Sequence, residues 1–363
     1  MKKILWLGPI VDPEKQTLTN AISPAANTWQ LEFIKGLIDN SISVTILTYM
    51  PDQVWPKGKI WIKYPSNETL NNKVENINVG YLNLYLIRDV WIPCALFIKT
   101  VFKTNLKKTN FFFSYNVPFR HRLFAIFIKF FSPHIKWLSI IADIGSKGNP
   151  DYHIFLSYDY FKKFPNNKKI FLDGGIPIIN DDIATKVETQ QKVLLYAGSI
   201  SEWTGIEDFC SLFDSISSQL DIELHIYGKG KSVQLNSLVE RNPKIKFFGF
   251  VSDSELHLAC QNAYAFINPR PLDAHQGENN FPSKLLMYLA YKKPILSTKT
   301  PNLSPSYDLL LNYYYGIDSL KAELQSIIRS KELYQLKKNS ISKYTKQNSW
   351  KEKIKLLLRS LEY

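Results

Sequence analysis

Residues 263–298 read AYAFINPRPLDAHQGENNFPSKLLMYLAYKKPILST, with an apolar run at each end. Ala263–Ile267 is a short run bounded by polar residues, and its composition predicts a buried strand. Pro294–Ser297 predicts a second strand, and the apolar residues that follow Pro282 predict a helix between the two. Strand, helix and strand in this order form the repeating unit of a parallel sheet with helices on both faces.

The loop and the helix start between these strands carry positive charge. Arg270 follows the first predicted strand, and Lys284 lies in the first turn of the predicted helix. A helix start offers unpaired backbone N–H groups and the positive end of the helix dipole. Arg270, Ser283 and Lys284 are therefore predicted donors to a diphosphate, and they would stabilise a leaving group as its negative charge grows. The alternative is a helix cap with a surface ion pair.

Two glycine-containing loops follow other predicted strands of the C-terminal half. In YAGSISEWTG (196–205), Gly198 lets a ligand approach the backbone, and Ser199 offers a hydroxyl to a phosphate. In YGKGK (227–231), Lys229 lies between glycines and could contact a diphosphate. Each loop alone is also typical of a plain turn between a strand and a helix. Neither has the GxxxxGK[ST] spacing of a P-loop, so an NTPase is not indicated.

The alternation of apolar runs and helical patterns extends along the chain. The predicted strands and short apolar runs of the N-terminal half are Ile4–Leu7, Ser43–Thr48, Gly80–Ile87, Asn110–Tyr115, Trp137–Ile141, Ile154–Ser157 and a last strand that starts at Lys169. Those of the C-terminal half are Val193–Ala197, Glu223–Tyr227, Ile245–Gly249, Tyr264–Ile267, Pro294–Ser297 and Asn312–Gly316. We expect an α/β fold with two Rossmann-like, doubly wound domains that face a central cleft.

Length and composition suit this organisation. A chain of 363 residues with 45% hydrophobic content corresponds to about two domains. The polar and charged segment 180–191 suits a linker between them. The predicted parts are an N-terminal domain at 1–178, a linker at 179–190, a C-terminal domain at 191–345 and a helical segment at 346–363 that crosses back toward the N-terminal domain.

The formal net charge of +13 indicates an anionic partner. Trp91–Lys103 and Arg120–Trp137 mix bulky apolar residues with lysine and arginine, a composition that suits the surface of an anionic membrane. Both segments are equally typical of buried helices with snorkelling lysines. No recognition-helix, OB or zinc signature is present, so we expect no nucleic-acid partner. No uncharged apolar run approaches the ~20 residues of a spanning helix.

Taken together, the C-terminal motifs resemble the GT-B fold glycosyltransferases, in particular the bacterial family-4 enzymes of cell-surface polysaccharide assembly. The similar runs are YAGSISEWTG, IYGKG, IKFFGFVSDSEL, FINPRP and NNFPSKLLMYLAYKKPILST, in the family's order. The resemblance implies sugar transfer from a nucleotide-sugar co-substrate, usually with retention, with no cofactor and no bound metal. It implies that Gly198 and Ser199 lie near the phosphates, Lys229 near the nucleotide, and Arg270 and Lys284 on the diphosphate.

The resemblance also implies a base and ribose pocket that includes Phe250, Val251, Glu278 and Met287. Relatives usually have a glutamate for the ribose hydroxyls at the position of Met287, and Glu278 is a nearby acid at a different spacing. Relatives commonly have a lysine or arginine at the position of Thr204. These departures leave open an unusual donor, a different ribose contact, or a non-catalytic partner protein that keeps the fold.

The N-terminal domain is expected to bind the acceptor. Asp143 follows the predicted strand Trp137–Ile141 and would contact a sugar hydroxyl or act as a base; its alternative is a helix cap or turn residue. His121 and His134 are expected near phosphate or at the surface. We expect a peripheral enzyme on the cytoplasmic face of the membrane, moving a sugar from a UDP-sugar to a lipid-linked saccharide in bacterial capsule, exopolysaccharide or O-antigen synthesis.

Overall fold

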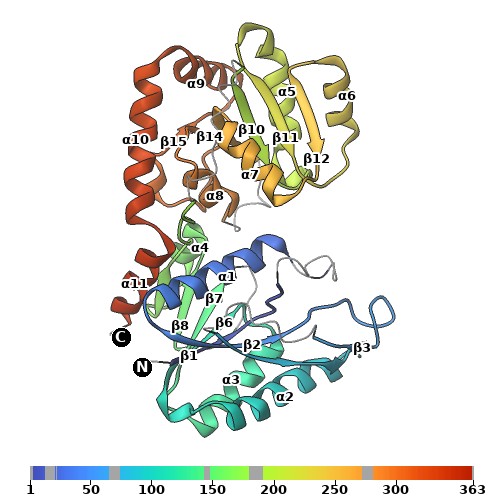
Figure 1. Ribbon diagram of the computed structural model, residues 1–363, viewed down its shortest axis with the longest axis vertical. Helices are drawn as coiled ribbons and strands as arrows, with labels where there is room; N and C mark the ends of the chain where they lie inside the picture. The colour runs from blue at the N-terminus through green and yellow to red at the C-terminus, as the bar shows by residue number, and fades with distance from the viewer. Residues whose placement is uncertain are drawn as a thin grey trace. The chain divides into compact units, whose positions relative to one another are not determined.

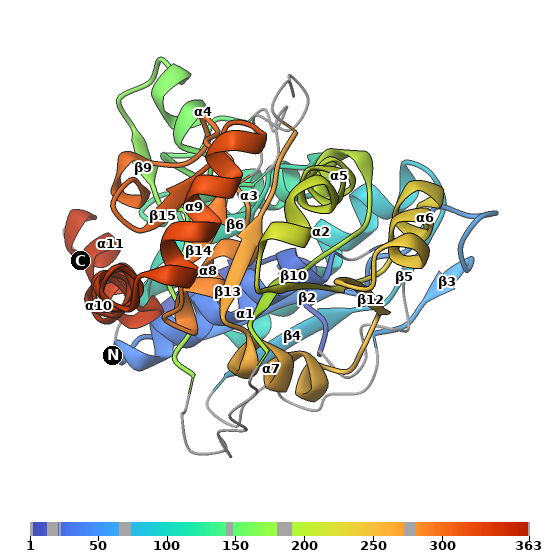
Figure 2. The same ribbon diagram turned by 90° about the horizontal axis from the view of Figure 1, so that it is seen from above.

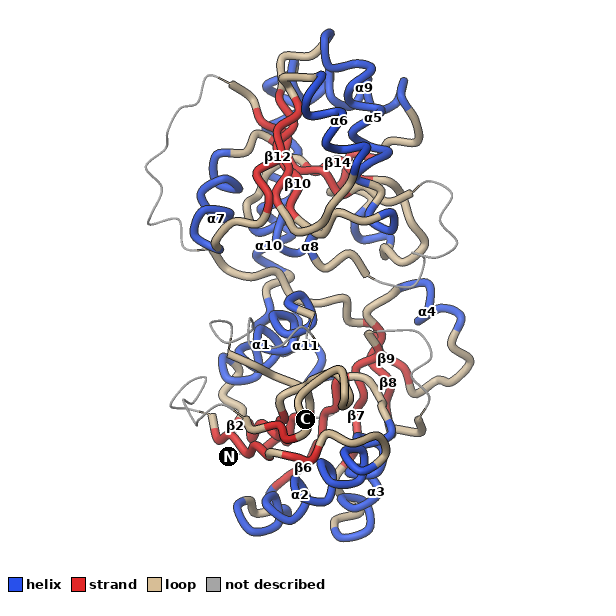
Figure 3. The backbone as a smooth tube through the Cα atoms, turned by 90° about the vertical axis from the view of Figure 1, so that its right-hand side faces the viewer, coloured by secondary structure: helices blue, strands red, loops and turns tan. Residues whose placement is uncertain are grey.

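The computed structural model describes residues 3–12, 21, 23–64, 74–142, 148–179, 191–271 and 281–361. The chain divides into two compact units: unit 1 contains Met1–Gly175 and Trp350–Tyr363, and unit 2 contains Ile176–Ser349. Each unit is a layer of strands with helices on both sides (Figures 1 and 3). The divisions at 175/176 and 349/350 lie within a few residues of the predicted boundaries at 178 and 345.

The described sheet of unit 2 has six parallel strands in the order β12-β11-β10-β13-β14-β15. In chain order these are β10 (Val193–Ala197), β11 (Glu223–Tyr227), β12 (Ile245–Gly249), β13 (Ala265–Asn268), β14 (Ile295–Ser297) and β15 (Leu311–Tyr313). The strand order reverses between β10 and β13. Sheets of this kind bind ligands at such a point, outside the carboxyl ends of the strands.

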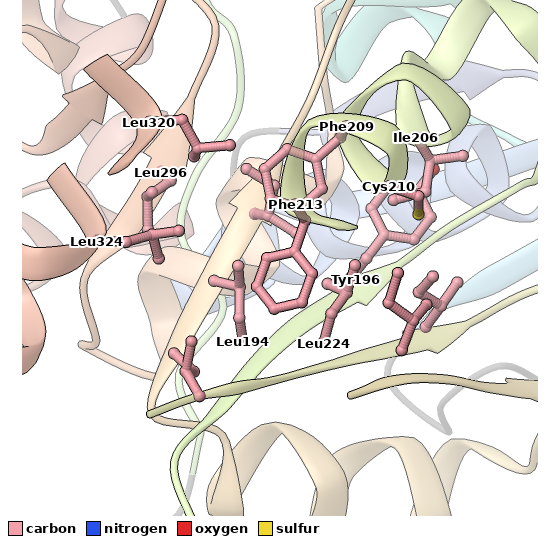
Figure 4. Close-up of a cluster of buried hydrophobic side chains, with 14 of the residues drawn as sticks. Leu194, Tyr196, Ile206, Phe209, Cys210, Phe213, Leu224, Leu296, Leu320 and Leu324 are labelled. Carbon is pink, nitrogen blue, oxygen red and sulfur yellow. The ribbon is translucent and has the colours of Figure 1, made fainter. Parts of the chain in front are cut away.

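Helices cover both faces of this sheet (Figure 2). One face carries α5 (Ile206–Ile216), α6 (Val233–Arg241) and α9 (Ile317–Arg329); the other carries α7 (Asp253–Asn262) and α8 (Lys284–Ala290), with α10 (Lys331–Gln347) against α8. Ile206, Phe209 and Phe213 recur at helical spacing on α5, and Figure 4 shows them packed on Leu194 and Tyr196 of β10. This core fixes α5, and with it the loop that joins β10 to α5.

The sheet of unit 1 has seven parallel strands among the described residues, in the order β4-β2-β1-β6-β7-β8-β9. In chain order these are β1 (Lys3–Leu7), β2 (Ser43–Tyr49), β4 (Glu75–Val79), β6 (Thr109–Tyr115), β7 (Lys136–Ile141), β8 (Tyr152–Phe155) and β9 (Lys169–Phe171). Helices α1 (Pro24–Asp39) and α11 (Trp350–Ser360) pack together on one face, and α2 (Ile87–Lys103) and α3 (Phe119–Phe131) on the other (Figure 1).

The last helix, α11, belongs to unit 1 because its first turn is buried there. The Trp350 ring lies edge-on to Trp29, with centroids 5.2 Å apart. Lys353 Nζ pairs with the buried carboxylate of Asp173 at 3.3 Å. A Cβ at Gly175 would lie 2.3 Å from Trp350 Cα, so only glycine fits there. The predicted final helix is therefore present, and its packing in unit 1 follows from tryptophan contacts.

One predicted run of unit 1 does not join the seven-stranded sheet. Within Gly80–Ile87, only Tyr81–Leu82 forms a strand, β5, which pairs antiparallel with β3 (Trp61–Ile62) in a separate two-stranded sheet, and α2 begins at Ile87. The edge strand beside β2 is instead β4, in which only Ile77 and Val79 are buried. Alternating polar residues gave β4 low hydrophobicity, whereas the aromatic residues after it form short local structures.

In the described part of the chain, no helix is long and apolar enough to cross a membrane.

Candidate functional site

The candidate site lies at the carboxyl ends of β10 and β13, which are parallel neighbours. The residues that gather there come from three segments: the loop after β10, the residues after β13, and the start of α8. Because parallel neighbours end at the same edge of a sheet, the loop of Gly198 and the strand end that carries Arg270 are brought together. The two predicted cations, Arg270 and Lys284, therefore meet at the loop after β10.

A buried tyrosine attaches α8 to the end of β10. The Tyr288 hydroxyl accepts a hydrogen bond from Ala197 N at 2.8 Å and donates one to Ala197 O at 3.2 Å. Its ring stacks on Phe266 of β13, with centroids 4.6 Å apart. Lys284 precedes Tyr288 by one helical turn, so both side chains leave the same face of α8. The anchor at Ala197 thus places Lys284 beside the preceding strand residue, Tyr196.

Lys284 is held by Tyr196 rather than extended into solvent. Its Nζ donates to the Tyr196 hydroxyl at 2.9 Å and lies 4.1 Å from the centroid of the tyrosine ring. A Cβ at Gly198 would lie 2.7 Å from the same Nζ, so glycine leaves room for the ammonium group. Burial lowers the pKa of Lys284 to about 7, with a further contribution from the positive charge of Arg270.

Arg270 is fixed to the same loop by its backbone and by its guanidinium group. Its Nη1 donates to Trp203 O at 3.1 Å, and its backbone N donates to Thr298 Oγ1 at 3.0 Å. Among the described residues its Nε is buried without a hydrogen-bond partner, and burial lowers the pKa of the guanidinium. A half-buried cation with a buried, unused Nε–H donor is suited to bind the oxygen of an anionic ligand.

Asn268 adds a second unused polar atom, which the sequence analysis did not select. The residue is 1% exposed; its Nδ2 donates to Ser297 Oγ at 2.9 Å, and its Oδ1 has no partner among the described residues. Asparagine at the end of an apolar strand was the only available signal, and it is equally typical of a turn.

The glycines of the two predicted phosphate loops are needed because the loops cross at backbone distance. Gly228 has φ +151°, and a Cβ there would lie 1.7 Å from Gly198 O. Gly230 has φ +154°, and a Cβ would lie 2.4 Å from Ile200 O. Ile200 N in turn donates to Lys229 O at 2.9 Å. The glycines thus have a structural role, and they leave the Lys229 side chain exposed beside the site.

The residues predicted around a base and ribose are brought to the same unit but differ in exposure. Phe250 is 79% exposed, and Val251 is half-buried before the Ser252–Glu255 capping box of α7. Met287 is half-buried on α8. Tyr227 and the exposed Phe248 stack with centroids 4.7 Å apart at the ends of β11 and β12. Glu278 lies outside the described residues.

Ser283 and Thr204 occupy well-defined positions. Ser283 immediately precedes α8 and makes no side-chain cap hydrogen bond. Because α8 has only seven residues, its dipole is a weak source of positive charge, and the positive character of this region comes mainly from Arg270 and Lys284. Thr204 is buried, and its hydroxyl donates to Ser201 O at 2.7 Å, so it stabilises the turn after β10.

The structure describes only some of the candidate residues in unit 1. Asp143 lies outside the described residues. His121 was expected near phosphate or at the surface, but it is 1% exposed, with Nε2 3.1 Å from the Tyr49 hydroxyl. Burial lowers the pKa of His121 to about 3, so the imidazole is neutral. Its surface assignment was wrong because α3 turns this side chain toward β2. His134 is exposed, as expected. No group of metal-ligating side chains occurs among the residues described.

One family model matches part of the chain, in unit 2. Residues 191–308 match the family model described as glycosyl transferases group 1. This segment contains the whole candidate site and the loops that shape it. No curated protein sequence matches the chain.

Solved structures extend the likeness to both units. The lipopolysaccharide outer core galactosyltransferase WaaB is 14% identical, with a TM-score of 0.65 and 99% of each chain covered. Sucrose-phosphate synthase from Thermosynechococcus elongatus is 13% identical, with a TM-score of 0.65 and 99% of each chain covered. HepE from Anabaena, in complex with UDP-glucose, is 11% identical, with a TM-score of 0.65 and 100% of each chain covered. The fold is therefore GT-B, and the predicted resemblance to GT-B glycosyltransferases is confirmed.

Proposed function

We propose that this protein is a glycosyltransferase that takes a sugar from a nucleotide-sugar, specifically a UDP-sugar. The observation that carries the proposal is the meeting of Arg270 and Lys284 at the loop after β10, in the segment that matches group 1 glycosyltransferases. Two half-buried cations that form no ion pair with a carboxylate within the described residues would gain most from a diphosphate. Structures of similar fold hold UDP and UDP-glucose, which supports this choice of donor.

In this proposal the residues of unit 2 divide the donor between them. Arg270 and Lys284 neutralise the charge that develops on the diphosphate as the bond to the sugar breaks, and the Ser283 and Lys284 amides contribute further donors. Gly198 and Ser199 lie along the phosphates, and Lys229 contacts the nucleotide. Phe250, Val251, Glu278 and Met287 border the base and ribose. No metal ion or cofactor takes part, and the transfer proceeds with retention.

The acceptor is proposed to bind unit 1, with Asp143 contacting a sugar hydroxyl or acting as the base. We further propose a lipid-linked saccharide as acceptor and a peripheral location on the cytoplasmic face of the membrane, in capsule, exopolysaccharide or O-antigen synthesis. Support comes from exposed apolar side chains on α2 and α3, here named the α2–α3 surface: Ile98, Val101, Phe102, Ile126, Phe130 and Phe131.

This surface combines apolar area with positive charge. Phe102 and Phe130 are 85% and 79% exposed, whereas Leu96 and Phe124 of the same helices are buried in the core. The exposed cations in or beside these helices are Lys99, Lys103, Lys107, Lys108, Arg122 and Lys136. Each cation adds about 1 kcal/mol near an anionic lipid surface, and burial of a phenylalanine adds about 1.5–3 kcal/mol.

The membrane proposal predicts that the protein floats with phosphatidylglycerol vesicles at low salt. Phe102→Ser combined with Phe130→Ser is expected to lower the bound fraction at least tenfold, because both apolar contacts are lost. Val233→Ser combined with Leu309→Ser is a matched control, since these side chains of unit 2 are 88% and 82% exposed. Equal flotation of the two double variants would remove the α2–α3 surface from the proposal.

A non-catalytic partner protein with this fold is the second candidate, favoured by Met287 at the position of the usual ribose glutamate. A thermal-shift panel with UDP, GDP, ADP, CMP and their common sugar conjugates separates the two. A bound ligand at ~100 times its Kd adds about 2.7 kcal/mol of stability. We expect stabilisation by UDP and by one UDP-sugar; no stabilisation by any nucleotide in the folded protein would favour the partner.

A further inference from the structure

The Tyr196 hydroxyl joins two separate parts of the candidate donor site. It donates to Ser199 O at 2.7 Å, which fixes the turn of the loop after β10. It accepts from Lys284 Nζ at 2.9 Å, which fixes the first residue of α8. Tyr196 itself is fully buried in the core of unit 2, so neither contact can be replaced by moving the ring.

The positions of its two partners decide which hydrogen bond the Tyr196 hydroxyl donates and which it accepts. A phenol has one proton, and here it is committed to the Ser199 carbonyl, which leaves oxygen lone pairs for the ammonium of Lys284. The ring face lies beneath the same ammonium, 4.1 Å from Nζ. Burial raises the pKa of Tyr196 to about 12, so the hydroxyl stays protonated and keeps this arrangement near neutral pH.

We propose that Tyr196 is a positioning residue that holds the Lys284 ammonium beside Gly198 and thereby sets the affinity of the site for a donor diphosphate. This inference rests on the proposed function, since it assigns a diphosphate to Lys284. Tyr196 contacts Lys284 and the loop, and has no assigned contact with the reacting sugar.

The surroundings of Lys284 make its charge depend on that contact. The titratable or charged groups that act on it are Tyr196 on β10 and Arg270 after β13, and Cys210 on α5 and Tyr288 on α8 interact with Tyr196 in turn. Arg270 and burial both disfavour the ammonium form. The hydroxyl oxygen and the ring face of Tyr196 favour it, so their loss would shift Lys284 toward the neutral amine.

The affinity for a diphosphate depends on the protonation of Lys284. The pKa of Lys284 is lowered to about 7 in the free protein, and a bound diphosphate would raise it again. Binding above pH 7 therefore takes up a proton, and the affinity is expected to fall as the pH rises, by up to about tenfold per pH unit. UDP-glucose is a suitable probe, because its diphosphate carries ester groups at both ends and lacks the ionisation near pH 6 of a terminal phosphate.

The test uses the full chain with Tyr196→Phe, which keeps the ring and removes the hydroxyl. Tyr264→Phe is the matched control: Tyr264 also donates to a backbone carbonyl, Ile327 O, at 2.7 Å in unit 2, away from Lys284. Competitive acetylation followed by mass spectrometry measures the titration of Lys284 without any ligand. Calorimetric titration with UDP-glucose measures Kd at about pH 6.5 and about pH 8.5.

We expect Tyr196→Phe to lower the pKa of Lys284 and to weaken UDP-glucose binding about tenfold at the higher pH, with a smaller effect at the lower pH. Tyr264→Phe should leave both readings unchanged. An unchanged Lys284 titration and Kd in Tyr196→Phe would overturn the inference. If the wild type fails to bind UDP-glucose while the Lys284 titration still shifts in Tyr196→Phe, the donor assignment falls and the positioning of Lys284 by Tyr196 stands.

Discussion

Arg270→Ala is expected to lower the rate of nucleotide-sugar turnover about 10²–10³-fold, the effect of removing one preorganised donor from a developing negative charge. The effect should appear mainly in kcat, because that charge is larger in the transition state than in the bound donor. Arg270 also donates to Trp203 O, so we expect a loss of about 1–3 kcal/mol in folding stability. Turnover is measured as release of the nucleotide from the sugar donor that stabilises the wild type.

Two further variants show whether the loss of turnover in Arg270→Ala comes from the missing guanidinium or from a general effect of removing an arginine. Arg270→Lys keeps the positive charge but lacks the forked guanidinium, and we expect it to recover only part of the rate. Arg329→Ala removes an exposed arginine from the end of α9 and should leave turnover unchanged. If Arg270→Ala is folded and turns over as fast as Arg329→Ala, Arg270 does not act on the leaving group.

Gly228→Ala is expected to destabilise unit 2 by about 3–5 kcal/mol, the sum of an overpacked contact and a strained backbone. The added Cβ would lie 1.7 Å from Gly198 O, and φ is +151°. Because the atom in the way belongs to the backbone, no side-chain movement can relieve the contact. The resulting shift of the loop after β10 should also weaken nucleotide binding. Urea unfolding monitored by tryptophan fluorescence measures the loss.

Gly249→Ala is the control for backbone strain alone. Gly249 has φ +70°, but a Cβ there would meet nothing within 4 Å. We expect a cost of about 1–2 kcal/mol, that of a left-handed conformation in a residue with a side chain. Equal costs at the two positions would mean that the loops of Gly198 and Gly228 do not cross as closely as described.

The strands of unit 2 could be predicted closely because each is a short apolar run that ends at glycine or a polar residue. β10, β11 and β12 have the predicted bounds. The strand missed in unit 1, β4, lies at a sheet edge, where only alternate side chains are buried and the hydrophobic signal is halved. The grouping of α11 with unit 1 depends on contacts of Trp350 with residues more than three hundred positions away.

The sequence was enough to predict the cations of the candidate site, but it did not indicate the residues that hold them in place. Arg270 and Lys284 were recognisable because positive charges follow an apolar strand and begin a helix. Tyr196 and Tyr288 lie within apolar runs, where sequence predicts only burial. Their hydroxyls matter because the fold places one beside Lys284 and the other beside the backbone of Ala197. Such contacts depend on how α8 packs against β10, which local sequence does not specify.

The most direct test of the donor site is a crystal structure of the protein with UDP. We expect a diphosphate whose oxygens lie within hydrogen-bond distance of the Arg270 guanidinium and Lys284 Nζ, at the loop of Gly198 and Ser199. We also expect Arg270 Nε to donate a hydrogen bond to a diphosphate oxygen, since that atom has no partner among the described residues. A nucleotide bound elsewhere in unit 2, with Lys284 still held only by Tyr196, would contradict this expectation.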